Sequence, residues 1–512
     1  MGRVASSVST LLLAFALVAP ADVWAQTKDD TVVYAIQSDM QNWDPPNSVL
    51  RESIIMGYHV FDHLAARDLK TGKVGPSLAL SWKNLDDTTW EVKLRQGVKF
   101  HDGTPFGAKD VKATFERVLD PEKKLTARGN HVKIKAVEVV DDLTVRFKTD
   151  GPYPLFVERL TAQVMQSEKV IREKGHEWMQ ENPIGTGPYK LVKWNKKQDH
   201  LLVRNEDYWG PKPAFKYARV RIIPEQATQI AELISGGVDV IKAVPPDQMD
   251  VINKSGQARI STSPILRTAF LQLDQAARSG PNPFTDVRVR KAANLAVDID
   301  SIIKHVLNGL GDRTATTINP MAFGLDPTLK PYKQDAAQAK KLLADAGYPN
   351  GFEVGFLRGQ PIVEPGLIQT SDTIVADLAK VGIRTKARMV GEIGPFVNLV
   401  RDGKADPMFE WSWGYYSIFD ADAILYDVMS CGQAYSYYCN KALDDLIIQG
   451  RSTLDQKKRA EIYQKAQKLI HDDAAYLFKW GLRGVWGVSN RVAYEAPRDE
   501  IDRMFLVTPR KK

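Results

Sequence analysis

Long hydrophobic runs are scarce in this sequence of 512 residues. The apolar run at residues 11–18 is shorter than the roughly 18–20 apolar residues that a membrane-spanning helix needs, and no later stretch approaches that length. Arg3 precedes this run and the pattern Val23-Trp24-Ala25 follows it, an order typical of a secretory signal peptide. We therefore predict that residues 1–25 are a Sec-type signal peptide cleaved after Ala25, and that the mature protein lies in the periplasm without membrane insertion.

Cysteine is nearly absent as well, since the chain has only Cys431 and Cys439. Neither stands near the predicted cleavage site, which indicates a free exported protein rather than a lipid-anchored one. In an oxidising compartment this pair predicts a disulfide that closes a small loop, with roughly 2–3 kcal/mol of stabilisation from loop-closure entropy. Metal binding is the alternative, but two thiols with no nearby histidine fall short of a tetrahedral zinc site.

The motifs of several common enzyme classes are missing. The sequence has no Gly-x-Ser-x-Gly elbow, no His-Glu-x-x-His zinc motif, no Walker loop and no Rossmann fingerprint. His59 and His63 stand four residues apart, as a metal-binding pair on a helix would, but no third ligand stands nearby, which favours a packed or surface pair. We predict a protein that is not an enzyme and holds no resident metal or cofactor, with a secreted hydrolase as the alternative.

Composition and charge limit the class of protein further. The chain is 44% hydrophobic and 26% charged, which is typical of a globular protein. At about 100–200 residues per domain it is too long for one core, which predicts two or three lobes. The formal net charge is +7, but the basic residues form no dense cluster, which argues against nucleic acid as a partner. A basic surface is the simplest interpretation, with an anionic ligand or an acidic partner as alternatives.

Strand and helix patterns alternate along the chain. Helical spacing places Val111, Phe115 and Val118 on one face, and Asp335 can cap a helix that Gly347 ends. Runs of buried or alternating apolar residues predict strands. These strands are expected at residues 32–36, 90–94, 143–147 and 383–389. Helices followed repeatedly by strands predict an α/β fold.

Several longer motifs follow one another in a specific order. The longest is Arg95-Gln96-Gly97-Val98-Lys99-Phe100-His101-Asp102-Gly103-Thr104-Pro105. Shorter motifs follow at residues 185–189 (Gly-Thr-Gly-Pro-Tyr), 205–210 (Asn-Glu-Asp-Tyr-Trp-Gly), 235–239 (Ser-Gly-Gly-Val-Asp), 284–292 (Phe-Thr-Asp-Val-Arg-Val-Arg-Lys-Ala) and 344–349 (Ala-Asp-Ala-Gly-Tyr-Pro). Over nearly the whole mature chain the sequence thereby resembles the family 5 extracellular solute-binding proteins, which serve dipeptide, oligopeptide, glutathione and nickel importers.

Most residues of these motifs predict structure rather than a site. We expect Gly103 and Gly187 at turn positions that need unusual backbone angles. Trp90, Phe100 and Tyr189 are expected to be core aromatics.

The resemblance implies a two-lobed clamshell with an additional subdomain, in which two hinge segments let the lobes close over a ligand. One lobe would be discontinuous, formed by residues 26–62, 185–280 and 488–512, with residues 63–184 as its extra subdomain. The other lobe would be formed by residues 281–487.

The family also implies where a peptide would be held. Peptide-binding relatives hold the ligand's amino group with an acidic residue after a Trp-containing strand, and some hold its carboxylate with an arginine ahead of the helix that precedes Gly382. Tyr415 falls at the first position, and residues 368–369, which carry no charge, fall near the second. Asp420 or Asp422 could replace the acid, and Arg267 or Arg358 the arginine, because Arg grips carboxylates bidentately.

The segment 411–422 is expected to line the ligand cleft, with Asp420 paired to a ligand cation and Trp413 or Tyr415 packed over the ligand's body. Its two Trp, two Tyr and one Phe stand around a glycine and two carboxylates, which suits a pocket for a polar ligand. The alternatives are core packing for the aromatics, and internal pairs or surface positions for the charges. The predicted ligand-binding residues are Asn42, Trp43, Arg267, Arg358, Trp411, Trp413, Tyr415, Tyr416, Asp420 and Asp422.

The function that the resemblance implies is that of a monomeric periplasmic protein that captures a small peptide-like or opine-like solute and delivers it to the inner-membrane permease subunits of an ABC importer. A nickel chelate or an oligosaccharide is the alternative ligand.

We predict that periplasmic material begins near Gln26 and carries an oxidised Cys431–Cys439 pair. Intact-mass measurement should show loss of the leader and a further deficit of about two mass units, because a disulfide removes two hydrogens. A thiol titration that finds two reactive cysteines would contradict the pairing.

Overall fold

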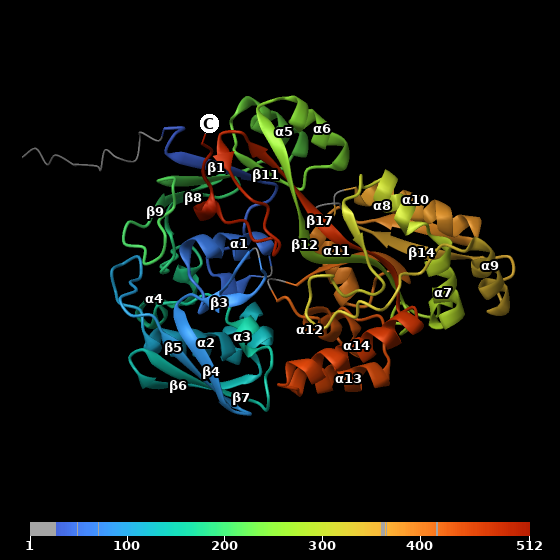
Figure 1. The fold of residues 1–512 in the computed structure, drawn as a ribbon, viewed down its shortest axis with the longest axis horizontal. Coiled ribbons are helices and arrows are strands. Elements are labelled where there is room, and N and C mark those ends of the chain that lie inside the picture. Colours follow the sequence, from blue (N-terminus) through green and yellow to red (C-terminus); the bar gives the residue numbers. More distant parts are fainter. Residues whose placement is uncertain are drawn as a thin grey trace, which may run out of the picture.

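The computed structural model describes residues 27–48, 50–69, 71–359, 364, 366–415 and 418–511. The predicted signal peptide at residues 1–25 lies outside these residues. Two lobes are visible, with a smaller subdomain below the first lobe and two long strands crossing the middle of the molecule (Figure 1). This arrangement agrees with the α/β architecture predicted from the sequence.

One eleven-stranded sheet runs through both lobes. Ten of its strands follow the order β15-β14-β16-β12-β17-β11-β1-β10-β9-β8, and β13 pairs with β17 beside that path. The strands are β1 (Thr31–Ile36), β8 (Tyr189–Asn195), β9 (Asp199–Arg204), β10 (Tyr217–Ile222), β11 (Val240–Lys242), β12 (Ala258–Leu273), β13 (Gly311–Arg313), β14 (Phe352–Arg358), β15 (Ile383–Met389), β16 (Met408–Gly414) and β17 (Tyr476–Ser489). The strands predicted at 32–36 and 383–389 correspond to β1 and β15.

The antiparallel strands β12 and β17 carry the sheet from one lobe to the other. The first paired stretch begins with Ala258 opposite Ser489 and ends with Pro264 opposite Arg483. Pairing is then interrupted and resumes with Thr268 opposite Gly481. β11 joins this ladder on the first-lobe side through β17, and β16 joins it on the second-lobe side through β12. Proline cannot donate to a sheet ladder, so Pro264 fits the end of the first paired stretch.

The two end strands of this sheet carry basic side chains. β15 has Arg384, Lys386 and Arg388 at exposed positions, and β8 has Lys190 and Lys193. Lysine and arginine are common on edge strands.

The subdomain is built on a separate antiparallel sheet with the order β4-β5-β7-β6. Its strands are β4 (Ala79–Asp86), β5 (Thr89–Leu94), β6 (Ile134–Asp141) and β7 (Thr144–Thr149). β5 and β7 confirm the predicted strands at 90–94 and 143–147. Helix α2 (Ala108–Leu119) buries Val111, Phe115 and Val118, as its spacing predicts. Two-stranded pairs are formed by β2 (Ala65–Arg67) with β3 (Val74–Pro76) and by β18 (Val492–Ala493) with β19 (Thr508–Pro509).

Helices cover both lobes and the subdomain (Figure 1). Apart from α2 they are α1 (Arg51–Val60), α3 (Phe156–Arg159), α4 (Glu168–Met179), α5 (Gln226–Ser235), α6 (Met249–Lys254), α7 (Val287–Ala296), α8 (Ile299–His305), α9 (Ala336–Asp345), α10 (Leu367–Lys380), α11 (Ile393–Arg401), α12 (Asp422–Ile424), α13 (Lys441–Ser452) and α14 (Gln456–Asp472). Among the described residues, none of these helices has both the length and the apolar character needed to cross a membrane.

Local signals in the sequence agree with the structure at most positions. The Asp335 side chain caps α9 by accepting a hydrogen bond from the Gln338 amide at 2.8 Å. Gly103 has a φ of 85°, as expected of a turn glycine. The expectation for Gly187 is wrong, because it lies outside the positive-φ region and is needed for close packing instead: a Cβ there would lie 2.5 Å from the Val60 carbonyl carbon.

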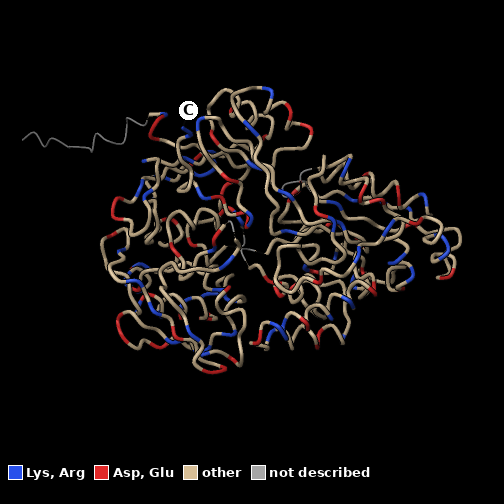
Figure 2. The backbone as a smooth tube through the Cα atoms, in the orientation of Figure 1, with Lys and Arg blue, Asp and Glu red and all other residues tan. Residues whose placement is uncertain are grey.

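Charges of both signs are spread over both lobes and the subdomain (Figure 2). Neither sign of charge is confined to one lobe.

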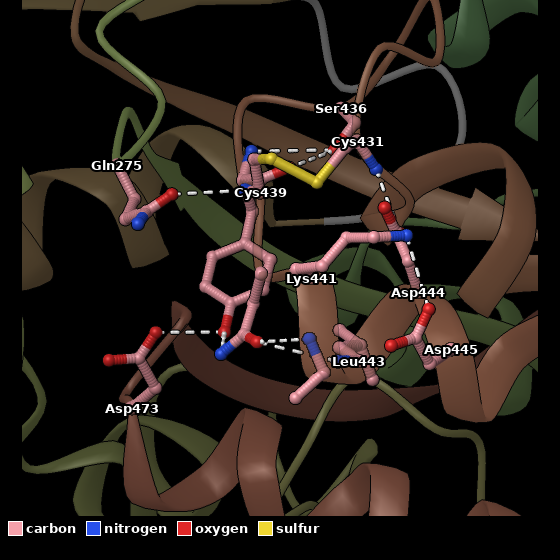
Figure 3. The surroundings of a disulfide bond; sticks show 12 residues. Gln275, Cys431, Ser436, Cys439, Lys441, Leu443, Asp444, Asp445 and Asp473 are labelled. Carbon is pink, nitrogen blue, oxygen red and sulfur yellow. Dashed lines mark hydrogen bonds and ion pairs between the residues drawn. A yellow bond between two sulfur atoms is a disulfide. The ribbon is translucent and has the colours of Figure 1, made fainter.

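The predicted disulfide is present between Cys431 and Cys439, ahead of α13 (Figure 3). The Cys439 amide donates to Gln275 Oε1 at 3.0 Å, and the Cys431 amide donates to Asp444 Oδ1 at 3.0 Å. The closed loop is thus fixed to the loop after β12 and to the first turn of α13.

Four histidines are neutral at neutral pH, three of them buried and the fourth, His101, half-buried. Burial lowers the pKa of His59 and His101 to about 4, and of His63 and His131 to about 3. His59 uses both ring nitrogens on the backbone, with Nδ1 3.0 Å from the Ile55 carbonyl and Nε2 2.9 Å from the Met504 amide. His63 packs on Tyr58 with ring centroids 4.1 Å apart, so the two histidines considered as a metal pair are a packed pair.

We expect the free energy of unfolding to fall as the pH drops from about 6.5 toward 4. In that window the unfolded chain protonates these histidines and the folded chain does not, which costs up to about 1.4 kcal/mol per pH unit for each histidine. Urea unfolding at pH 7, 6 and 5 measures the slope. His131→Leu removes one of the four histidines and should make the free energy of unfolding less dependent on pH. A variant with the same pH dependence as wild type would show that the histidines are not its cause.

Candidate functional site

Strand β16 carries the two predicted tryptophans into an aromatic cluster of the second lobe. Trp411 is 9% exposed and stacks between Phe396 and Tyr435, with both centroid distances 5.9 Å. Trp413 is half-buried and donates its indole N–H to the Ala423 carbonyl at 2.5 Å. The core-packing alternative therefore describes Trp411 well, whereas Trp413 keeps some exposed surface.

Tyr415 is enclosed by backbone partners. It is 1% exposed, its hydroxyl accepts from the Asn319 amide at 2.9 Å, and it donates to the Thr317 carbonyl at 3.2 Å. Burial raises its pKa above the usual range. Tyr416 lies outside the described residues.

Asp420 and Asp422 belong to a buried ionic cluster with helices α13 and α14. The Arg459 guanidinium grips Asp420 through two hydrogen bonds of 2.5 and 2.8 Å. Asp422 lies 3.5 Å from Arg451 and accepts from the Tyr463 hydroxyl at 3.4 Å. The cation that faces Asp420 in this structure is thus Arg459, which matches the internal-pair alternative. Contact between Asp420 and a ligand stays a prediction.

The two predicted arginines have internal partners of different kinds. Arg267 on β12 is buried and lies 3.2 Å from Glu500 of the C-terminal segment. Arg358 at the end of β14 pairs with the exposed Asp372 of α10 at 2.8 Å. The backbone of Arg267 pairs with Gly414 of β16, whereas Arg358 ends β14, which pairs with β16 only at Phe356 and Leu357.

Asn42 and Trp43 form a packed loop of the first lobe. The Asn42 side chain accepts from the Asp44 amide at 2.9 Å. Trp43 is fully buried and contacts His200 edge to face, with ring centroids 5.5 Å apart. The structure thus groups Arg267 with residues 411–415, and it places Asn42 and Trp43 apart from them.

A cavity, which we call the main cavity, lies beside the crossing strands. It contains about 1010 Å³ of atom-free space, part of it open solvent. Its walls come from the end of β1, from α1, from the end of β11, from β17 and from residues 500–504. Its charged lining residues are Arg51, Glu52, Lys242, Arg483, Glu500 and Asp502.

Glu500 organises the charges on one wall of this cavity. Its carboxylate lies 2.8 Å from Arg51 and 3.2 Å from Arg267. Burial alone would raise the pKa of Glu500, but these two guanidinium groups outweigh it and hold that pKa below the usual value. The carboxylate is therefore ionised at neutral pH and fixes both arginines.

Asp502 fixes other residues of the lining. Its carboxylate accepts from the Trp486 indole at 2.8 Å and from the Tyr494 hydroxyl at 2.6 Å, and Lys242 lies 3.3 Å away. Burial and the nearby Asp502 charge raise the pKa of Tyr34 well above its usual value, so its phenol is neutral.

The sequence predicts none of these charged lining residues as a ligand contact, and the predicted Arg267 meets the lining only through its pair with Glu500. The pair between Arg267 and Glu500 joins residues 233 positions apart, and the short charged pattern at 500–502 resembles any exposed tail. A contact between residues so far apart cannot be predicted from a local sequence pattern.

The arrangement can grip a polar ligand without reacting with it. His59, the histidine among the described lining residues, has both ring nitrogens engaged by the backbone and cannot serve as a free base. A charged cavity beside the strands that join two lobes is a typical place for a small ligand.

Comparison with known proteins identifies the family. Residues 73–436 match the model of the bacterial extracellular solute-binding proteins, family 5, and the chain belongs to this family. The resemblance read from the motifs is thereby confirmed. The family is one of binding proteins.

Similar proteins cover almost the full chain. The dipeptide-binding protein of Escherichia coli K12 is 28% identical over 521 aligned residues, which cover 95% of this chain and 94% of the relative. The glutathione-binding protein GsiB of the same strain is 26% identical, with 93% and 92% covered. The ABC transporter-associated periplasmic binding protein DppA from Helicobacter pylori, solved with the peptide STSA, has a TM-score of 0.82 and 28% identity, with 94% and 98% covered. The predicted clamshell fold and the role as solute-binding component of an ABC importer are confirmed.

We predict that Asp420→Asn destabilises the protein by about 3–5 kcal/mol, because it leaves the buried Arg459 cation without its counter-charge. Urea unfolding measures the change. Asp372→Asn removes the exposed partner of Arg358 and serves as the control, with an expected effect below about 1 kcal/mol. Equal stability of Asp420→Asn and wild type, together with weaker ligand binding, would instead support a ligand contact for Asp420.

Proposed function

We propose that the mature protein, freed of residues 1–25 by cleavage after Ala25, is a periplasmic monomer that captures a small peptide-like or opine-like solute in the main cavity. It then delivers this solute to the inner-membrane permease of an ABC importer and performs no chemistry on it. The observation that carries the proposal is the charged cavity at the junction of the lobes.

The lining of the cavity suits a solute with both apolar and polar parts. Ile55, Met56 and Ile265 supply apolar surface, while Gln37 and the charged residues lie around it. Small-ligand sites typically combine such an apolar lining with a few fixed polar groups. A short peptide has this mixed character.

Relatives with named ligands support the peptide class. The E. coli proteins are named for dipeptides and for glutathione, and the H. pylori protein was solved with a peptide. All three ligands contain peptide bonds and charged ends, so the same class is proposed for this chain.

The end of β16 supports a contribution of the second lobe to the site. A Cβ at Gly414 would lie 2.6 Å from Arg51 Nη2, so this strand end touches a residue that lines the cavity. We therefore keep Trp413 and residues 415–416 as proposed ligand contacts on that side.

The crossing strands support closure over the ligand. We propose hinges where regular pairing of β12 with β17 is interrupted, at residues 264–268 and 481–483. The predicted lobe boundaries at 280/281 and 487/488 stay predictions. A ligand that contacts both lobes binds the closed state better and shifts the population toward it.

A thermal-shift screen over short peptides, glutathione, opines, short sugars and nickel chelates tests the ligand class. Peptides or opines should raise Tm, by an amount equivalent to about 2.7 kcal/mol at one hundred times Kd. Small-angle scattering with the same compound should report a smaller radius of gyration. A rise in Tm with sugars or nickel chelates alone would overturn the peptide-like assignment.

A further inference from the structure

The three cations that line the main cavity all have carboxylate partners. Arg51 pairs with Glu500 at 2.8 Å, and Lys242 lies 3.3 Å from Asp502. The third, Arg483 of β17, pairs with Asp312 of β13 at 2.8 Å. Each of the three lining cations therefore already has a carboxylate partner within the protein, although Arg51 shares Glu500 with the buried Arg267.

Glu52 lines the same cavity, but its charge has no partner among the described residues. It lies in the first turn of α1 and is half-buried. Within the described part of the chain its carboxylate makes neither a hydrogen bond nor an ion pair, although Arg51 and Lys242 line the same space. The lining has three cations and three carboxylates, and among the described lining residues Glu52 is the carboxylate that forms no ion pair.

Further hydrogen-bond acceptors lie in the same lining. The Gln37 amide donates its N–H to Gln226 at 2.9 Å, and its carbonyl oxygen accepts from no described residue. The hydroxyl of Tyr34, a residue that is 3% exposed, interacts with the Asp502 carboxylate but makes no hydrogen bond of normal geometry in the described chain. The Tyr34 and Gln37 oxygens can therefore each still accept a hydrogen bond. A nitrogen cation, with several N–H donors, would satisfy such a set.

We propose that Glu52 is a specificity-determining residue that pairs with a cationic nitrogen of the solute, an ammonium or a guanidinium group, with Gln37 and Tyr34 beside it as acceptors. This inference deepens the proposed function and rests on the same cavity. It assigns the anchoring acid to the first lobe, in α1, rather than to the segment 411–422.

The competing explanation for Glu52 is structural. An acidic residue in the first turn of a helix interacts favourably with the helix dipole whether or not a ligand is present. That role predicts a small change in stability and no change in ligand preference. Glu168, in the first turn of α4, provides the control, because Glu168→Gln makes the same chemical change in a first helical turn away from the cavity; it also removes an exposed pair with Arg172, which affects stability and not ligand binding.

The experiment uses matched probes whose charge differs at one nitrogen. One arm is a set of dipeptides with a free amino terminus and the same dipeptides N-acetylated. The other arm is agmatine and putrescine, which are cationic and contain no peptide bond. Thermal shift ranks the probes, and calorimetry gives Kd for the full-length mature wild type, Glu52→Gln, Glu52→Asp and Glu168→Gln.

The free-amine dipeptides should bind the wild type and the acetylated ones should not. Glu52→Gln should weaken the free-amine probe at least about tenfold, because a charged partner is lost from a partly desolvated pair. Glu52→Asp keeps the charge and should retain part of the affinity, while Glu168→Gln should bind like wild type.

Three results would overturn the assignment: equal binding of acetylated and free dipeptides, an unchanged preference in Glu52→Gln, or no binding of any cationic probe in either arm. Failure of the broader proposal gives a different pattern. If acetylated and free dipeptides bind equally, the peptide-like ligand stands and the role of Glu52 fails. If agmatine or putrescine alone binds and Glu52→Gln abolishes that binding, the role of Glu52 stands and the peptide-like ligand fails.

Discussion

The antiparallel pairing of β12 with β17 is the interaction on which the rest of the structure depends. Because these strands are sixteen and fourteen residues long, one ladder serves both lobes, and β11 and β16 attach to it on opposite sides of the interruption near Pro264. Bending a two-stranded connection moves whole lobes without breaking their cores. The same ladder places the ends of β1, α1 and the C-terminal segment around one cavity, which is why the site lies at this junction.

Buried charge pairs between distant segments determine which residues remain available for a ligand. Lys479 of β17 is fully buried and lies 2.9 Å from Glu364 and 3.1 Å from Glu410. Burial would lower the pKa of this lysine, but the two carboxylates outweigh it and raise that pKa, so the charge persists. A buried charge is costly unless it is paired, and the described cations of the site obey this rule. A charged group of the cavity that has no partner in the described chain, such as the Glu52 carboxylate, therefore indicates where a charged group of the ligand would bind.

The sequence predicts the fold far better than the site, for a physical reason. Strand alternation around Val92, the face of α2 and the Asp335 cap are local patterns, and the structure confirms each. Gly187 is a miss because its glycine is required by a contact with Val60 from a distant segment. The site depends on contacts of the same distant kind, as in Arg267 with Glu500 or Asp420 with Arg459. The aromatic density of residues 411–422 is visible in the sequence, but whether those rings face a core or a cleft is decided by neighbours that no local pattern names.

The basic end strands of the large sheet affect how readily two copies of the protein can associate through their sheet edges. A sheet that ends at β15 and β8 presents backbone donors and acceptors that another copy could extend into a continuous ribbon. Arg384, Lys386 and Arg388 place like charges along one such border, and Lys190 and Lys193 along the other, so two copies meeting edge to edge repel each other and must desolvate these groups. Charges of one sign along both borders disfavour edge-to-edge pairing of copies, even though the sheet is long enough to join two lobes.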